Sequence, residues 1–323
     1  MCALLLAASL PARAQVRVPL PDIRVDLRYD VIDGGDERHR LQTALRLQQR
    51  VQLTEAASVI GFVATGGRFA SRWVTWADLR EGEDSVDPFC PHFRQLYGQY
   101  TTDAYRMQVG AIPSVKGVIS PTGLDPAGWI DGGRFEWYFA AESALEMVVG
   151  RLGDVRTPGV FDRSLPFGNP QRTNYAEMEV SAQLEATWRG ELSVEHLRVL
   201  YLRTELRRTL DPIEWFVELL YNTDSQAAGY GATLALRDLP LGLVVQATYA
   251  YKDEAIGQRG ELADDFFTFG QSIRLNVRRP FASRLGFRWF AELIVAERPE
   301  ADGLLDDVYT RFNTGLNWRR PRR

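Results

Sequence analysis

Residues 176–189 read AEMEVSAQLEATWR, with an apolar side chain at every even position and a polar one at every odd position. Successive side chains of a β-strand point to opposite faces of the sheet, so this segment predicts strand with one apolar and one polar face. The stretch exceeds the roughly five or six residues typical of strands in soluble sheets. Its length instead suits a tilted strand that crosses a membrane.

The same alternation recurs along the whole chain. It is present in residues 23–31, 41–54, 129–139, 213–222, 243–252, 267–278, 285–295 and 308–318. Aromatic residues gather near the ends of these segments, where membrane barrels carry their interfacial bands. A soluble β-sandwich also alternates, but the segment lengths and the aromatic positions favour a membrane barrel over it.

The connections alternate in length as well. Short ones lie near 54–57, 101–104, 140–143, 238–241 and 279–283, and long ones at 66–92, 113–128, 153–173, 253–264 and 297–306. Short turns at one end and long loops at the other are typical of outer-membrane barrels. The fold class predicted is therefore all-β, a single-chain antiparallel transmembrane β-barrel.

The number of strands depends on residues 190–210. About fifteen segments qualify as strands, whereas a single-chain bacterial barrel has an even number. Residues 190–210 fit either a strand or a helix capped by Ser193, since they contain many good helix formers. The helical interpretation gives about 14 strands, which we favour, and a missed hairpin partner gives 16.

The N-terminus predicts export. Residues 1–14 contain a short apolar core and end in Ala12-Arg13-Ala14, a pattern typical of signal-peptide cleavage. We expect residues 1–14 to be a signal peptide and residues 15–323 to form the barrel. Cleavage would remove Cys2 and leave Cys90 as the one cysteine, so we expect no intrachain disulfide.

Composition and motifs argue against several classes of function. The formal net charge is −4, which disfavours a nucleic-acid partner. His39, His92 and His196 lie far apart without the spacing of metal ligands, and no catalytic set is apparent. We expect no enzymatic activity, no metal and no cofactor.

Residues 93–139 carry a family resemblance. Phe93-Arg-Gln-Leu-Tyr-Gly-Gln-Tyr100 is followed by Tyr105-Arg-Met-Gln-Val-Gly110 and, after a loop, by Trp129-Ile-Asp-Gly-Gly-Arg-Phe-Glu-Trp137. This order resembles a hairpin, loop and return strand of the alginate-export-like, substrate-specific porins. The resemblance implies a channel in the outer membrane of a Gram-negative-type bacterium.

The polar faces of the strands supply the candidate pore-lining residues. These are Arg24, Arg28, Arg46, Arg50, Arg106, Arg134, Glu136, Glu177, Glu179, Glu214, Glu218, Arg274, Arg278, Arg288, Glu292 and Arg311. Closure makes the first and last strands neighbours, so their arginines would form a basic wall opposite an acidic wall from residues 177–218. Charged walls of this kind set selectivity in channels.

We therefore expect passive passage of small anionic or sugar-like solutes through an outer-membrane channel. The partners expected are the lipid bilayer and a small solute, with a homo-oligomer possible. The alternative is a non-conducting structural or interaction barrel whose lumen is plugged by side chains or by residues 153–173.

Overall fold

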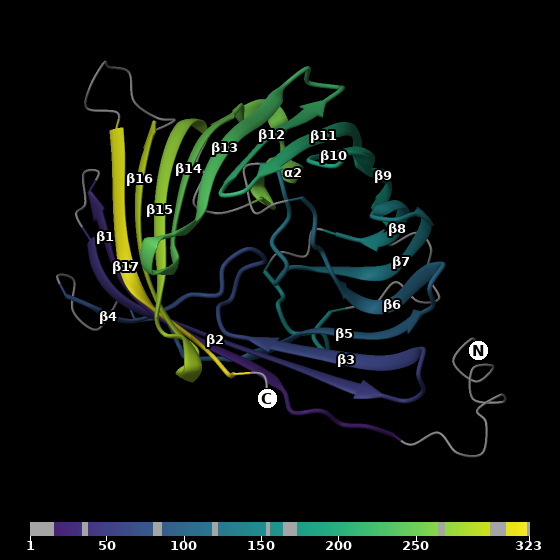
Figure 1. Ribbon diagram of the computed structural model, residues 1–323, viewed down its shortest axis with the longest axis horizontal. Coiled ribbons are helices and arrows are strands. Elements are labelled where there is room, and N and C mark those ends of the chain that lie inside the picture. The colour runs from purple at the N-terminus through teal and green to yellow at the C-terminus, as the bar shows by residue number, and fades with distance from the viewer. Residues whose placement is uncertain are drawn as a thin grey trace.

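The computed structural model describes residues 16–33, 38–79, 86–117, 122–152, 156–163, 173–263, 269–297 and 308–321. The expected signal peptide, residues 1–14, lies outside this part of the chain. The described residues form one antiparallel sheet that closes into a barrel, which confirms the predicted fold class (Figure 1).

Within the described ranges the sheet contains seventeen strands. They are β1 (Asp22–Asp33), β2 (Arg38–Gln52), β3 (Ala57–Ala64), β4 (Val74–Asp78), β5 (His92–Thr101), β6 (Tyr105–Pro113), β7 (Trp129–Ala140), β8 (Ser143–Arg151), β9 (Tyr175–Glu185), β10 (Trp188–Leu197), β11 (Val199–Leu210), β12 (Ile213–Asn222), β13 (Ala228–Leu239), β14 (Leu243–Lys252), β15 (Gly270–Ala282), β16 (Phe287–Glu297) and β17 (Val308–Arg319). Short helical turns occupy η4 (Pro240–Gly242), η5 (Glu254–Ile256), α2 (Gln258–Glu261) and η6 (Ser283–Leu285). No helix in the described ranges is long and apolar enough to cross a membrane.

The barrel has sixteen strand positions because β3 and β4 share one of them. β3 pairs with Arg46–Gln52 of β2, and β4 pairs with Arg40–Thr43 of the same strand. The chain leaves the wall between them, over residues 65–73, which we call the inner insert. The ring closes because β1 pairs with both β2 and β17.

The favoured count of about 14 is therefore wrong, and the alternative of 16 holds. Residues 190–210 are not a helix: they belong to β10 and β11, joined at Arg198, whose φ is 64°. Pairing on both sides within the sheet outweighs the helix propensity of this segment. The stretch 176–189 is likewise divided, since β9 ends at Glu185 and β10 begins at Trp188.

The barrel buries polar side chains and exposes apolar ones, the reverse of a soluble domain. On β1, Asp26 and Asp30 are 3% and 0% exposed, while Leu27 between them is 46% exposed. Met178 and Glu177 on β9 divide in the same way, at 51% and 7%. The alternation in the sequence thus separates an apolar outer face from a charged inner face.

Connection lengths follow the predicted rhythm. The links after β2, β5, β7, β9, β11, β13 and β15 are short and lie at one end of the barrel, which we call the turn end. β1 begins and β17 ends at the turn end, since Arg24 near the start of β1 pairs with Arg319, the last residue of β17. The longer links after β4, β6, β8, β14 and β16 lie at the opposite, loop end.

Several loop segments turn into the ring (Figure 1). Phe69 from the inner insert and Leu124 from the β6–β7 loop are buried with Trp129, Leu197 and Tyr201 of the wall in one apolar cluster. This cluster fills the lumen beside the wall that runs from β3 to β13. Burial of that apolar surface holds the loops inside the barrel.

Candidate functional site

A single arginine fixes the inner insert. The guanidinium of Arg94 on β5 is fully buried and donates to the carbonyl oxygens of Thr65 at 2.9 Å and Gly66 at 2.6 Å. It also donates to the carbonyl of Ser71 at 2.8 Å and contacts those of Phe69 and Ala127. Arg94 therefore joins the insert and the β6–β7 loop to the wall through charge-assisted hydrogen bonds.

The β6–β7 loop is anchored to the acidic part of the wall. Lys116 pairs with Glu177 and Glu179 of β9, and the Thr122 hydroxyl donates to Glu218 of β12. Arg259 of α2, in the β14–β15 loop, donates to the carboxylate of Glu195 on β10 at 2.6 Å and to the carbonyl of Thr122 at 2.9 Å. Loop residues that fill this half of the lumen therefore engage four wall carboxylates, those of Glu177, Glu179, Glu195 and Glu218.

The last two residues of the inner insert, Arg72 and Trp73, face the other half of the lumen. One guanidinium nitrogen of Arg72, Nη1, donates to both carboxylate oxygens of Asp125, at 2.7 and 2.8 Å. The guanidinium carbon of Arg28 lies over the Trp73 ring, 3.9 Å from the ring centroid. Arg72 and Trp73 thus form one side of the space that remains open.

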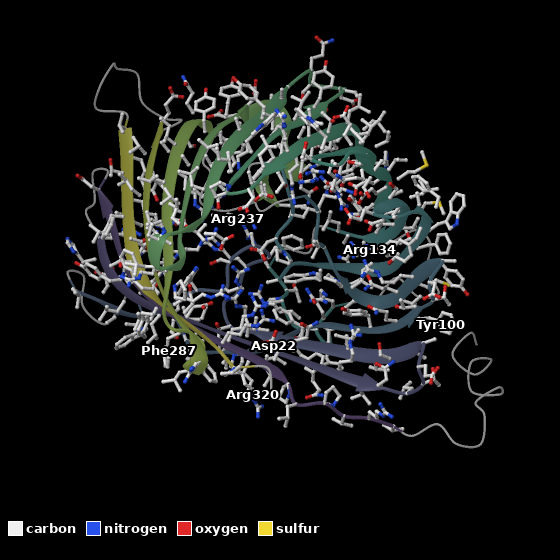
Figure 2. All side chains as sticks on the ribbon, in the orientation of Figure 1. Asp22, Tyr100, Arg134, Arg237, Phe287 and Arg320 are labelled. Carbon is white, nitrogen blue, oxygen red and sulfur yellow. The ribbon has the colours of Figure 1, made fainter. Side chains whose placement is uncertain are left out.

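This open space, the central cavity, has a volume of about 430 Å³. Its lining residues are Asp26, Arg28, Arg46, Arg72, Trp73, Arg207, Glu214, Phe216, Ala235, Arg237, Val244, Gln246, Arg274, Asn276, Arg278, Phe290, Glu292, Asn313 and Asn317. Figure 2 shows Arg237 in the interior and Tyr100 at the outer edge of the ring. Among the described residues, seven arginines and three carboxylates face the cavity, an excess of four positive charges in the lining.

Each carboxylate of the central cavity is bound to an arginine. Asp26 pairs with Arg46, Glu214 with Arg237, and Glu292 with Arg274. Arg278 instead donates to the neutral amide oxygen of Gln246 at 3.0 Å. Arg72 and Arg207 also pair with carboxylates, Asp125 and Glu205, that lie outside the lining. These pairs reduce the positive excess of the described lining residues from four charges to two.

The seam between the first and last strands is closed by three inward aspartates of β1. Asp30 accepts from Arg311 at 2.6 and 3.0 Å and from Arg40 at 2.9 Å. Asp26 accepts from Asn317 at 2.8 Å, and Asp22 from Arg319 at 2.6 Å. The arginines of the terminal strands are thus interleaved with carboxylates rather than standing as an all-basic wall.

The structure separates the sixteen candidate residues into groups. Arg28, Arg46, Glu214, Arg274, Arg278 and Glu292 line the central cavity. Glu177, Glu179 and Glu218 contact the β6–β7 loop, while Arg24 and Arg311 lie at the seam. Arg106 pairs with Glu136, Arg134 lies 3.3 Å from Glu146, and Arg288 is an exposed side chain on β16.

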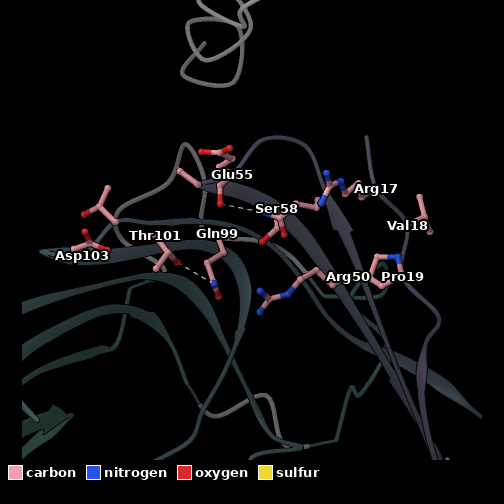
Figure 3. Close-up of a pocket in the computed structure, with 12 residues that line it drawn as sticks. Arg17, Val18, Pro19, Arg50, Glu55, Ser58, Gln99, Thr101 and Asp103 are labelled. Carbon is pink, nitrogen blue, oxygen red and sulfur yellow. Dashed lines mark hydrogen bonds between the residues drawn. The ribbon is translucent and has the colours of Figure 1, made fainter. Parts of the chain in front are cut away.

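Arg50 lies in a second concavity, at the turn end. This space of about 950 Å³ lies between residues Arg17–Pro19 and the parts of β2, β3 and β5 that are nearest the turn end (Figure 3). Gln99, Thr101 and Ser58 give it a polar lining.

Sequence reasoning missed several cavity residues. Arg207 would have been included if residues 190–210 had been assigned as strand, since odd positions of β11 face inward. Arg237 belongs to β13, a strand without a clean alternation in its sequence. Arg72 and Trp73 fall in a predicted loop, and no local pattern indicates that this loop turns into the lumen.

Comparison with known proteins gives a result for structure only. No family model matches the chain, and no curated protein matches it in sequence. The structure is similar to that of Pseudomonas putida OprB, with a TM-score of 0.57 at 10% identity over 94% of each chain. It is also similar to OmpT of Vibrio cholerae lacking loop L8, described as an outer membrane protein, with a TM-score of 0.54 at 11% identity over 94% of this chain and 99% of that one.

Pseudomonas aeruginosa OpdO is a third similar structure, with a TM-score of 0.51 at 12% identity over 93% of this chain and 96% of that chain. At these identities the likeness establishes a shared fold. The chain has the closed barrel fold of outer-membrane porins, so the predicted resemblance to porins is confirmed at the level of the fold.

Proposed function

We propose that this protein is a passive channel of the bacterial outer membrane that admits small anionic solutes. The observation that carries the proposal is the central cavity, in which seven arginines and three carboxylates face a water-accessible space inside a closed barrel. Charges inside a low-dielectric wall focus the field and raise the local concentration of counter-ions. The excess of arginine favours anionic over neutral, sugar-like solutes.

The outer face supports a membrane location. Large apolar side chains on successive strands are exposed, among them Leu27, Met178, Leu192, Val217 and Leu293. Aromatic pairs such as Trp188 with Trp215 and Phe281 with Phe287 lie near the turn end, and Tyr230 with Tyr251 near the loop end. Two aromatic bands around an apolar belt are the arrangement expected at the two membrane interfaces.

The arginine contacts suit passage rather than tight binding. Five of the seven described cavity arginines are held by neighbouring carboxylates, so each offers part of its guanidinium to a passing solute. A channel needs several weak contacts, because a solute bound tightly at one point would not leave. Guanidinium groups also bind carboxylate and phosphate in a bidentate manner, which gives preference for oxyanions.

The non-conducting barrel remains the second candidate, because loops fill the lumen beside β3 to β13. Single-channel recording of the refolded protein in a planar bilayer distinguishes the two functions. We expect discrete conductance steps in KCl. Inserted protein that carries no current would overturn the channel and support the plugged barrel.

A further inference from the structure

Four arginines of the central cavity region lie together on three strands. Arg237 belongs to β13, Arg274 and Arg278 to β15, and Arg288 to β16. Arg278 is acted on electrostatically by the other three and by Glu292. Arg237, Arg274 and Arg278 line the central cavity, and Arg288 is an exposed side chain beside it, diagonal to Arg278 across the β15–β16 pair.

The carboxylates nearby balance only part of this charge. Glu214 is bound to Arg237 and Glu292 to Arg274. The hydrogen bond of Arg278 goes to the amide oxygen of Gln246, a neutral group. Counted over the described residues of this cluster, four guanidinium groups and two carboxylates leave a local excess of two positive charges.

We infer that this cluster is a binding point for a small divalent oxyanion, with Arg278 as the residue that determines the preference for two charges. This inference deepens the proposed function by naming the valence of the preferred solute. A divalent anion neutralises the local excess, whereas a monovalent one leaves Arg278 among like charges. Arginine supplies the bidentate geometry that carboxylate and phosphate oxygens accept.

The volume and the remaining lining fit such a solute. A space of about 430 Å³ accommodates a short dicarboxylate together with water. Asn276 and Gln246 add amide groups beside Arg278. Binding remains reversible because Arg237 and Arg274 keep their own carboxylate partners.

Succinate and butyrate are the probes, since both are short-chain carboxylates that differ chiefly in the second charge. Titration calorimetry of the refolded full chain should show succinate binding about tenfold or more tightly than butyrate, the scale of one added charged hydrogen bond. In single-channel recordings, succinate should reduce chloride current at a correspondingly lower concentration than butyrate.

The variant Arg278→Gln should remove the preference, and Arg288→Gln should reduce it. Arg208→Gln is the matched control, because Arg208 lies on β11 against the ring of Trp188 and does not line the cavity. Equal affinity for succinate and butyrate in the unaltered protein would overturn the inference, as would an unchanged preference in a folded Arg278→Gln variant. A barrel that binds succinate selectively but carries no current would refute the channel and leave this site standing.

Discussion

Replacing Asp30 by asparagine tests whether the β1–β17 seam is held by buried charge. Asp30 is fully buried and accepts three hydrogen bonds, two from Arg311 and one from Arg40, all between 2.6 and 3.0 Å. The Asp30→Asn variant removes the negative charge and turns an amide donor toward two guanidinium groups. Arg311 is itself only 9% exposed, so water cannot replace the lost partner well.

The expected loss follows from those contacts. Removing one partner of a buried ion pair costs about 3–5 kcal/mol, mainly because the other charge stays buried. Three hydrogen bonds to charged groups, at roughly 1.5–3 kcal/mol each, would give more if they were additive, which contacts in one network are not. We therefore expect unfolding free energy to fall by about 3–5 kcal/mol.

Urea unfolding of the protein in phosphocholine vesicles, followed by tryptophan fluorescence, measures this loss. Asp33→Asn is the matched control, since Asp33 is exposed at the end of the same strand. The double variant Asp30→Asn with Arg311→Gln should lose less than the sum of the two single variants by about 1 kcal/mol or more. Equal small losses for Asp30→Asn and Asp33→Asn, or strict additivity in the double variant, would refute the reasoning.

Four further changes, one of them a control, probe other parts of the structure. Met178→Arg places a charge on the apolar outer face and should cost about 2–4 kcal/mol by the same urea assay. Gln183→Arg, on the inner face of the same strand, should cost below about 1 kcal/mol, and equal costs would contradict the assignment of faces. Arg94→Leu should free the inner insert, so we expect larger fluctuations of single-channel current, and current as steady as in the unaltered protein would argue against the anchor. Trp73→Ala removes the indole ring beside Arg28, and the unit conductance should rise; a fall would show that the ring does not restrict the cavity.

The period-two alternation was enough to predict the architecture. Segments such as 213–222 and 243–252 coincide with β12 and β14, because each strand must present one face to the outside and one to the lumen. The hairpin of β10 and β11 escaped prediction because its turn is the single residue Arg198, which carries no glycine or proline signal. Helix propensity was then misleading, since sheet pairing decides the structure there.

The site was harder to predict than the wall. Alternation identifies which residues face inward, but not which of them the loops cover. Glu177 and Glu218 face inward as predicted, and they are bound by Lys116 and Thr122 of a loop that the sequence places outside the barrel. Contacts over long sequence separations of this kind have no local pattern, so the charge that remains exposed to a solute could be read only from the structure.

The central claim is that the open half of the lumen selects anions. The direct measurement is the reversal potential of the refolded channel across a KCl gradient, for the unaltered protein and for the variant with Arg46→Ala and Arg274→Ala. In the unaltered protein we predict a reversal potential of the sign set by chloride. In the variant the potential should move toward zero, because the described cavity lining then has five arginines instead of seven against the same three carboxylates. A potential of the sign set by potassium in the unaltered protein, or an ion preference unchanged by the loss of both arginines, would contradict the account.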